Sequence, residues 1–334
     1  MPERLPDDHP IRWGVFGAGE IAAKVCADIA RTDGNVITGV AARDGDRARK
    51  FANHAGIANS YASYAELAAA DDVDVVYVAT IHPMHREQAL LAIAAGKSVL
   101  IEKPVCLNAH ASREVFDAAR RADVFAMEAM WMRTNPLIRK AERLIDDGMI
   151  GDIRAVRAEF GMRRAFDPDD RLYDVAAGGG ALLDIGIYPV TYAWLYLGRP
   201  DDVAVAGSLS PTGSDATVAL QWDYADGRDA QLWCSVELET PNRGLLIGTE
   251  GWIEFQGRFH RPDRLVLHNA DGDTIVDDPL AGHGFGYGPE IAEVARCLRA
   301  GLVESPLIPH ADTIAIMELL DDARAKLGVK YPGE

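Results

Sequence analysis

A short glycine-rich run constrains the fold of this chain more than any other feature. The letters GAGEIA at residues 17–22 follow an apolar stretch over 11–16 and open an amphipathic stretch over 20–32. One glycine permits a tight turn, the next lets the backbone approach a pyrophosphate, and the small final residue allows close packing of helix on strand. This context favours a dinucleotide-binding βαβ unit over a purely structural glycine turn. The cofactor contacts expected from the run are Gly17, Ala18, Gly19, Glu20 and Ile21.

Apolar runs alternate with amphipathic stretches from residue 11 to about residue 130, which is typical of βαβ units around a parallel sheet. The expected strands lie near 11–16, 36–42, 73–80, 97–101 and 124–128. The expected helices lie near 20–32, 44–54, 63–70, 84–95 and 108–122. We therefore predict an α/β domain over residues 1–130, a Rossmann fold with a doubly wound parallel sheet.

The pattern changes after residue 130, and 334 residues favour two domains over one large domain with an elaborated second layer. A helix near 136–147 precedes a strand, and the apolar residues 181–198 are expected to form a helix in which Pro189 is absorbed as a kink. Several strands without intervening helices follow, near 202–209, 215–223, 229–238, 243–248, 251–256 and 263–268. Helices near 287–300 and 311–327 close the chain. Residues 131–334 are thus predicted to form an α+β domain with a large open, mostly antiparallel sheet.

The overall totals exclude several classes of function. A formal net charge of −17 disfavours nucleic acid or an anionic membrane as the main partner, although local cations can still bind a small anion. The four cysteines form no CxxC pair and no even framework, which indicates a reducing compartment. The first ten residues lack the apolar core of a signal peptide, and no apolar run approaches the ~20 residues that cross a bilayer. We expect a cytoplasmic protein with a small-molecule substrate.

The residues after the second expected strand bear on cofactor preference. An acidic side chain there binds the ribose 2′-hydroxyl of NAD, whereas a cation accommodates the 2′-phosphate of NADP. The chain has Ala42-Arg43-Asp44, and Arg47 follows one helical turn later, so the two arginines can bind one phosphate between them. Asp44 could instead bind the ribose hydroxyl. We predict NADP, with NAD as the alternative.

Two further loops follow expected strands at the edge where a doubly wound sheet binds its ligand. The first contains Thr80, His82 and His85. Their HxxH spacing lacks a convincing third ligand nearby, so we expect these residues beside the cofactor and no metal. The second loop contains Glu102 and Lys103, followed by Pro104. Burying an ammonium is costly unless it is paired, so Lys103 is a candidate for chemistry.

The letters DIGIY at residues 184–188 form the last constellation. On a helix, Asp184 and Tyr188 are four residues apart and share one face, while Gly186 leaves space for a ligand or another backbone. Considered by itself, the segment is more typical of an apolar helix in which the aspartate is hydrogen-bonded within the fold and the tyrosine packs in the core.

Taken together, four motifs resemble the Gfo/Idh/MocA oxidoreductase family. They are GAGEIA, EKP at residues 102–104, MEAMWMR at 127–133 and GGGALLDIGIY at 178–188, in order and at matching spacing between about residues 11 and 330. Within the family, the likeness is closest to the branch of the dimeric dihydrodiol and NADP-dependent D-xylose dehydrogenases. Most members carry histidine where this chain has Tyr188, and the tyrosine is the mark of that branch.

The resemblance implies a Rossmann domain, a homodimer through the open face of the second sheet, and a sugar or diol as substrate. It places Lys103 beside nicotinamide and substrate, and it makes Asp184 and Tyr188 functional residues. The proton is then carried either by Tyr188, with its phenolate stabilised by Lys103, or by Lys103 itself. Trp131 and Phe160 are expected as an apolar or stacking wall for the substrate, and Arg133 as a contact to the cofactor.

Two alternatives stay open. A regulator that senses a nucleotide could keep this fold without catalysis, but it would not need Lys103, Asp184 and Tyr188 together. A reductase acting on an imine or a keto-sugar would use the same residues. The homodimer has a second motivation, since apolar residues alternate along residues 217–224 and 230–238, and an uncovered apolar face requires a partner.

Overall fold

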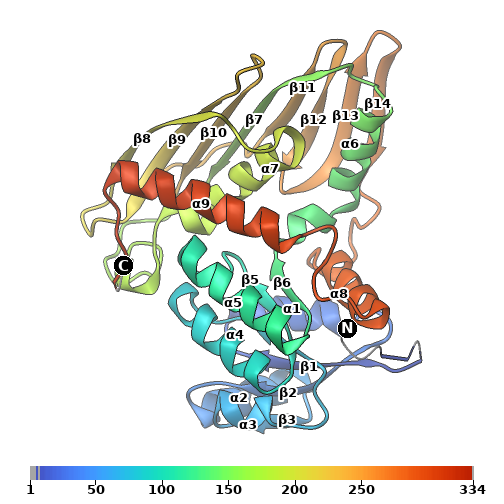
Figure 1. Ribbon diagram of the computed structural model, residues 1–334, viewed down its shortest axis with the longest axis vertical. Coiled ribbons are helices and arrows are strands. Elements are labelled where there is room, and N and C mark those ends of the chain that lie inside the picture. The colour runs from blue at the N-terminus through green and yellow to red at the C-terminus, as the bar shows by residue number, and fades with distance from the viewer. Residues whose placement is uncertain (1–4, 7, 333–334) are drawn as a thin grey trace. The chain divides into compact units, whose positions relative to one another are not determined.

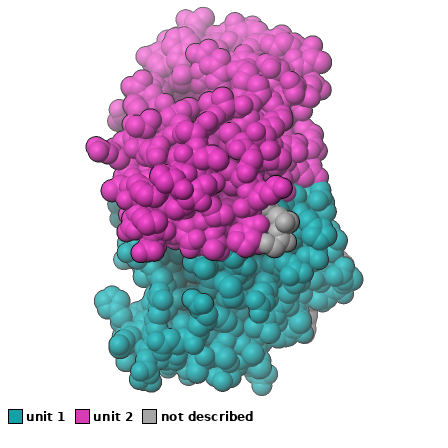
Figure 2. Space-filling view, turned by 90° about the vertical axis from the view of Figure 1, so that its left-hand side faces the viewer, with its two compact units in different colours: residues 1–134, 282–314 teal, residues 135–281, 315–334 magenta. Residues whose placement is uncertain are grey.

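The computed structural model describes residues 5–6 and 8–332, and the chain divides into two compact units, coloured separately in Figure 2. Unit 1 comprises residues 1–134 and 282–314, and unit 2 comprises residues 135–281 and 315–334. The expected division at residue 130 differs mainly in the segment 282–314, which joins unit 1. In that segment, apolar side chains of α8 (Gly288–Ala300) are buried, and the helix contacts α1 and residues 131–134.

Unit 1 is built on a sheet of six parallel strands in the order β3-β2-β1-β4-β5-β6 (Figure 1). This is the doubly wound order, in which successive strands are added on one side as far as β3 and then on the other side of β1 from β4 onwards, so the predicted Rossmann fold is confirmed. The three-residue β3 was not expected, because so short a strand carries no periodicity. The strands are β1 (Ile11–Phe16), β2 (Asn35–Ala41), β3 (Asn59–Tyr61), β4 (Val75–Val78), β5 (Ser98–Glu102) and β6 (Ala126–Ala129).

Helices connect these strands, and β4, β5 and β6 are buried along their whole length. Burial on both faces explains why β4 is a continuous apolar run and why β5 and β6 are mostly apolar. Side chains cap several helices at their N-termini: Asp44 caps α2, Ser63 caps α3 and Asn108 caps α5. Besides α8, the helices of unit 1 are α1 (Glu20–Ile29), α2 (Gly45–Ala55), α3 (Tyr64–Ala68), α4 (His85–Ala94) and α5 (Ala109–Ala122).

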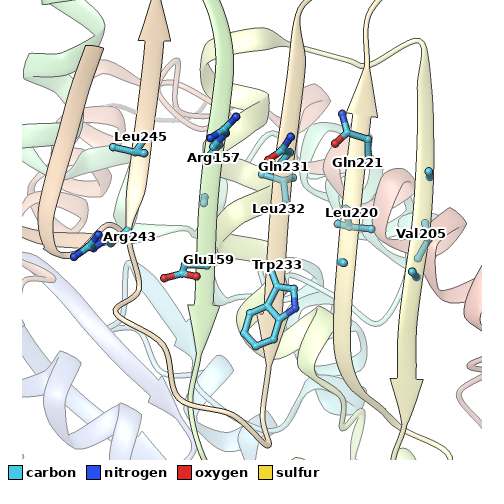
Figure 3. A pocket seen from close by; sticks show the side chains of 14 residues that line it. Arg157, Glu159, Val205, Leu220, Gln221, Gln231, Leu232, Trp233, Arg243 and Leu245 are labelled. Atoms are coloured by element: carbon cyan, nitrogen blue, oxygen red, sulfur yellow. The ribbon is translucent and has the colours of Figure 1, made fainter.

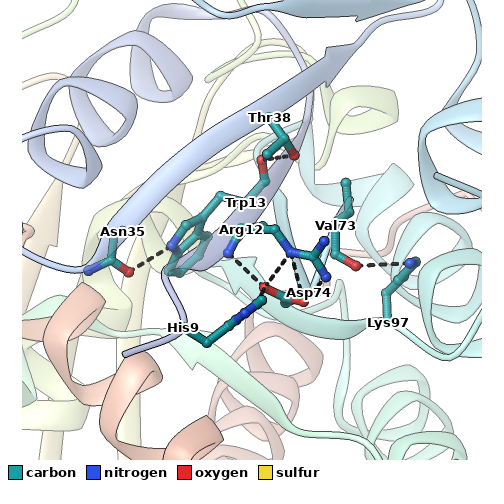
Figure 4. A network of polar contacts seen from close by, with 8 residues as sticks. All are labelled: His9, Arg12, Trp13, Asn35, Thr38, Val73, Asp74 and Lys97. Carbon is teal, nitrogen blue, oxygen red and sulfur yellow. Dashed lines mark hydrogen bonds and ion pairs between the residues drawn. The ribbon is translucent and has the colours of Figure 1, made fainter. Parts of the chain in front are cut away.

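A network of polar contacts connects the amino ends of these strands (Figure 4). The glycine loop lies at the opposite, carboxyl ends of the strands. Asp74 accepts hydrogen bonds from the Arg12 main-chain N–H at 2.8 Å and from its guanidinium Nη2 at 2.6 Å. Burial by itself would raise the pKa of Asp74, but the hydrogen bonds from Arg12 outweigh it and lower the pKa. Lys97 donates to the carbonyl oxygens of Ala70 and Val73 at 2.7 and 2.9 Å. These charges therefore stabilise the fold.

Unit 2 contains a sheet of eight strands in the order β14-β13-β12-β11-β7-β10-β9-β8. Among the described strands, β7 and β10 are its one parallel pair, so the predicted open and mostly antiparallel sheet is confirmed. The edge strand β14 was not expected, since it is almost entirely exposed. The strands are β7 (Ile153–Gly161), β8 (Asp202–Leu209), β9 (Asp215–Asp223), β10 (Asp229–Ser235), β11 (Gly244–Gly248), β12 (Gly251–Arg258), β13 (Arg261–Asn269) and β14 (Gly272–Asp277).

The two faces of this sheet differ. α7 (Ile187–Leu197) contacts β7 and β10, α6 (Pro136–Asp146) contacts β13, and the end of α9 (His310–Leu327) hydrogen-bonds to β8. We call the face they cover the covered face. The apolar residues that alternate in 217–224 and 230–238 are buried, as expected for the covered face, so their use as evidence for an apolar open face was wrong. They are Val218, Leu220, Trp222, Leu232 and Cys234.

The segment expected as one helix over 181–198 has two parts. Residues Leu182–Gly186 form a π-helical turn, and α7 begins at Ile187. Pro189 therefore lies in the first turn of α7, where the missing N–H of proline is best tolerated. The expected kink inside a continuous α-helix is replaced by the π-helical turn, a feature often found at functional sites.

Candidate functional site

The glycine loop of unit 1 has the shape that a pyrophosphate requires. Gly17 has φ 113°, and a Cβ there would lie 2.6 Å from the carbonyl oxygen of Ala79, so only glycine fits. Gly19 is the N-cap of α1, so it has no side chain to bond the first N–H groups of the helix. A Cβ at this position would meet no atom within 4 Å. The N-terminus of α1 is thus uncapped by its N-cap residue and uncrowded at Gly19, which suits an anion.

At the start of α2, an acid and a cation have separate tasks. The Oδ1 of Asp44 accepts from the main-chain N–H of Asp46 at 2.9 Å and of Arg47 at 3.4 Å, so this carboxylate caps the helix. The Nη2 of Arg47 donates to the carbonyl oxygen of Ala18 at 3.2 Å, which places its guanidinium beside the glycine loop. Arg43 is exposed. Asp44 therefore has a structural role as the N-cap of α2, while the guanidinium groups of Arg43 and Arg47 remain suited to binding a phosphate.

The loop after β4 is tied to the loop after β5 by a buried histidine. His85 has no exposed surface, and its Nδ1 and Nε2 lie 2.9 Å from the Pro104 oxygen and 3.1 Å from the Thr80 oxygen. Burial lowers the pKa of His85. The two partners are carbonyl oxygens, so a neutral imidazole, which carries one N–H, donates a hydrogen bond to one of them at a time. A cofactor contact stays a prediction for Thr80, for His85 and for His82, which is 7% exposed.

Two buried carboxyl groups accept hydrogen bonds from the main chain at and just after Lys103. Glu102 accepts from the Tyr77 hydroxyl and, at 3.2 Å, from the Lys103 N–H. Glu128 accepts from the Val105 N–H at 3.0 Å. Burial raises the pKa of Glu128 to about 7, although its hydrogen bonds and two nearby cations lower it. Glu102 was expected to contact the cofactor, and it is 8% exposed. Glu128 was not predicted as a site residue. Its position as a charged residue within an otherwise apolar strand could have identified it.

The order of the parallel strands brings these features to one edge of the sheet. β1 pairs with β4 and β4 pairs with β5, each in parallel, so their carboxyl ends lie side by side. Gly17, Thr80 and Lys103 follow those three ends directly or within two residues. Ligands bind at this edge in doubly wound sheets, next to the point where the strand order reverses.

Trp131 and Arg133 lie in the 3₁₀ turn that ends the first segment of unit 1. The Trp131 ring lies 4.9 Å from the Tyr287 ring, measured between centroids, and 8% of the residue is exposed. The Nη2 of Arg133 pairs with Asp312 at 2.8 Å. The predicted contacts of Trp131 with substrate and of Arg133 with cofactor stay predictions, and the ion pair gives Arg133 a structural role as well.

In unit 2, the π-helical turn carries Asp184 next to an arginine that sequence reasoning missed. Nη1 and Nη2 of Arg171 donate to the two carboxylate oxygens of Asp184 at 3.2 and 3.4 Å. The Asp184 side chain is 7% exposed and that of Arg171 is 52% exposed. The pair therefore presents an oriented carboxylate beside an accessible guanidinium, a combination able to bind hydroxyl groups. Arg171 lies in a loop without periodicity, so no pattern identified it.

Tyr188 belongs to a cluster of three rings from three elements. Its ring centroid lies 5.6 Å from that of Phe160 on β7 and 4.8 Å from that of His260, which precedes β13. Phe160 and His260 stack at 4.4 Å with an interplanar angle of 11°. Tyr188 is 6% and His260 5% exposed. The structure thus brings together two predicted site residues, Phe160 and Tyr188, and adds His260, which no sequence pattern indicated. Lys103 lies in unit 1 and Tyr188 in unit 2, so their joint action belongs to the proposal below.

A buried aspartate holds the start of the π-helical turn. The Oδ2 of Asp215 accepts from the Leu182 N–H at 2.5 Å, and Asp215 has no exposed surface. Gly180 has φ 137°, and a Cβ there would lie 2.3 Å from the Oδ1 of Asp215. The glycine run at 178–180 therefore lets the chain pass this carboxyl group closely.

The ionisation of Asp215 should make stability depend on pH. Burial raises its pKa from 3.8 to about 6, against main-chain hydrogen bonds that lower it. Between those two values the folded state binds more protons than the unfolded state, so its free energy of unfolding falls as pH rises. Asp215→Asn cannot ionise. Its stability relative to the unchanged protein should therefore rise by about 3 kcal/mol between pH 3.5 and pH 7.5, measured by urea unfolding. A difference that is constant with pH would contradict this ionisation.

Within residues 5–6 and 8–332, no helix is long and apolar enough to cross a membrane. In the same part of the chain, His, Cys, Asp and Glu side chains form no group of three or more that could hold a metal ion.

Comparisons with known proteins fit this arrangement. Residues 11–130 match the model of an oxidoreductase family with an NAD-binding Rossmann fold, and residues 138–254 match the GFO/IDH/MocA C-terminal domain. The trans-1,2-dihydrobenzene-1,2-diol dehydrogenases of Danio rerio and Homo sapiens are 36% and 35% identical, with 96% of this chain and 98% of each relative covered.

A solved structure shows the same fold. KijD10, a 3-ketoreductase from Actinomadura kijaniata in complex with NADP and TDP-benzene, is 28% identical with a TM-score of 0.82, covering 95% of this chain and 98% of that one. The relatives in both comparisons extend over both units. The chain therefore belongs to the Gfo/Idh/MocA family of oxidoreductases, with an NAD(P)-binding Rossmann domain followed by the C-terminal domain of that family.

Proposed function

We propose that this protein is a cytoplasmic dehydrogenase that transfers a hydride between NADP and a CH–OH group of a sugar or diol, such as D-xylose or a trans-dihydrodiol. The proposal rests mainly on Lys103, whose main-chain N–H donates to Glu102 and which lies two residues before Val105, bound by Glu128, at the same sheet edge as the glycine loop. The names of the curated relatives support a diol as substrate. The four cysteines are free and buried, as a reducing compartment permits.

The cofactor, when bound, supplies the hydride-accepting carbon, and the protein must handle the hydroxyl proton. The first N–H groups of α1 would hold the pyrophosphate, and Arg43 and Arg47 the 2′-phosphate. A free tyrosine has a pKa of ~10, so Tyr188 needs its phenolate stabilised, and the ammonium of Lys103 supplies that positive charge. Asp184, oriented by Arg171, accepts hydrogen bonds from substrate hydroxyl groups.

A second candidate is the reverse reaction on a keto-sugar, with the same groups donating the proton. It is favoured by the similarity to a protein described as a 3-ketoreductase in complex with NADP. Steady-state assays with both cofactors test the two together, using a panel of aldoses and trans-diols for oxidation and keto-sugars for reduction. NADP-dependent oxidation of an aldose or diol with the highest kcat/KM supports the dehydrogenase. Turnover of ketones alone would support the reductase, and no turnover of either class would refute both.

The two arginines at the start of α2 predict the cofactor preference. Arg43→Ala should raise KM for NADP by ~10- to 100-fold while changing KM for NAD little, because it removes one charge-assisted contact to the 2′-phosphate. Arg49→Ala is a matched control, since Arg49 lies exposed on the same helix and pairs with Asp46. Equal losses for both cofactors would argue against a phosphate clamp.

We also propose a homodimer through the face of the unit 2 sheet opposite the covered face, which we call the open face. A hollow of about 650 Å³ lies there (Figure 3). Apolar Trp233 and Leu245 lie among charged residues of both signs, so two copies related by a two-fold axis can pair Arg157 or Arg243 with Glu159. The open face is therefore mixed rather than apolar, and complementary charges would supply part of the specificity.

Light scattering tests the assembly. The unchanged protein should have twice the chain mass of 36.2 kDa, and Trp233→Glu should have the mass of one chain. Val36→Glu places the same charge on an exposed apolar residue of β2 in unit 1 and should leave the dimer intact. A monomer at working concentration would reject the dimer, and a dimer that survives Trp233→Glu would place the interface elsewhere.

A further inference from the structure

We propose that His260 is a positioning residue for Tyr188, whose ring it fixes together with Phe160. The inference rests on the proposed function, because it assigns His260 a part in the same proton transfer. It adds a residue from the β12–β13 connection to a site otherwise drawn from β7 and α7.

The three rings leave Tyr188 little freedom. His260 lies 4.8 Å from the Tyr188 ring at an interplanar angle of 36°, and Phe160 lies 5.6 Å from it at 45°. His260 in turn stacks nearly parallel on Phe160, at 4.4 Å and 11°. Each ring therefore contacts the other two, and moving the phenol requires displacing the stacked pair. These separations are close to or within the range of favourable aromatic contacts.

The neighbouring residue, Phe259, supplies contacts to the hairpin that do not involve His260. Phe259 has no exposed surface, and its ring packs at 5.2 Å against Tyr192, one helical turn beyond Tyr188. A Cβ on Gly244 would lie 2.6 Å from the Cβ of Phe259, so the β11 backbone packs closely on this side chain. Phe259 thus anchors the β12–β13 connection. His260 can then be replaced without removing that anchor, which makes its effect on Tyr188 measurable.

The geometry matters because a proton donor or acceptor must lie within hydrogen-bond reach of the reacting oxygen. A displacement of about 1 Å can cost on the order of 10²-fold in rate. His260→Leu, which removes the ring, should therefore lower kcat by ~10- to 100-fold and leave KM for NADP nearly unchanged. His260→Phe keeps a flat ring and should restore most of the lost turnover. This rescue separates ring stacking from any role of the imidazole nitrogens.

A matched control lies on the next strand. His268 of β13 stacks on Trp252 at 4.6 Å and 16°, and it makes no part of the Tyr188 cluster. His268→Leu removes a comparable stack and should leave kcat unchanged. Normal turnover in His260→Leu would overturn the inference. So would a His260→Phe variant as impaired as His260→Leu, or an equal loss in His268→Leu.

A readout that does not need turnover keeps this inference separate from the proposed function. With 3-fluorotyrosine incorporated throughout, the signal of Tyr188 is identified by its loss in Tyr188→Phe. A fixed ring gives two fluorine resonances, one for each orientation, and a freely flipping ring gives one averaged resonance. We expect two in the unchanged protein and in His260→Phe, and one in His260→Leu. One averaged resonance in the unchanged protein would overturn the positioning role, even if Tyr188 proves catalytic. If Tyr188→Phe remains active, the proposed proton transfer fails while the resonances still decide the positioning.

Discussion

Lys103→Met should lower kcat by ~10²- to 10⁴-fold, the range found when a group that transfers or stabilises a proton is removed. Methionine keeps an unbranched side chain but has neither the ammonium charge nor its donors. Because we propose that the pyrophosphate contacts come from the glycine loop, the dissociation constant of NADP should change little. The measurements are steady-state kinetics and cofactor titration by nicotinamide fluorescence.

The control is Lys50→Met, which removes an exposed lysine from α2 in the same unit and should leave kcat unaltered. A Lys103→Met variant with normal turnover would remove the lysine from the reaction. Lost turnover with an equal loss of NADP binding would instead indicate that the loop after β5 had collapsed. Thermal unfolding of each variant distinguishes that collapse from a chemical effect.

Tyr188→Phe should also lower kcat by ~10²- to 10⁴-fold, because it removes only the hydroxyl group that we propose exchanges the proton. The ring remains, so its contacts with Phe160 and His260 are kept. Tyr192→Phe is a close control in the same helix. The Tyr192 hydroxyl is buried and has no hydrogen-bond partner among the described residues, so losing it should not slow the reaction.

The double variant of Lys103 and Tyr188 decides how the two groups act. If they work as one unit, the double variant should be little slower than the slower single variant, since such effects are not additive. If Tyr188→Phe keeps near-normal turnover while Lys103→Met is inactive, the lysine alone carries the proton and the tyrosine is a wall of the pocket. Activity in both single variants would place the active site elsewhere.

Local patterns were enough to predict most helices and strands and the sheet edge of the Rossmann domain where a dinucleotide is expected. The glycine run, the apolar strands of unit 1 and the alternation in β9 and β10 each follow from contacts between near neighbours in the sequence. β3 and β14 escaped prediction because one is three residues long and the other is mostly exposed. The π-helical turn escaped because a period of 3.6 residues gives no warning of one added residue.

The residues that surround the candidate site could be predicted less well from the sequence. Lys103, Asp184 and Tyr188 were found from motifs, but the residues that hold them were found only in the structure. Glu128 reaches Val105 across 23 positions, and Arg171 reaches Asp184 across 13. His85 lies buried between the carbonyl oxygens of Pro104 and Thr80, a role in packing that its motif did not predict, and its cofactor contact stays a prediction.

Periodicity and glycine geometry act over a few residues, so they were sufficient to predict the Rossmann fold and the open second sheet, whereas the roles of Lys103, Asp184 and Tyr188 stay predictions from the resemblance. Contacts between distant segments were needed to show that residues 282–314 join unit 1, that the alternating apolar residues of β9 and β10 are buried, and that His260 packs against Tyr188. These contacts form between segments that are far apart in the sequence and meet only when the chain folds. A pattern among neighbouring residues does not specify which distant segments will meet.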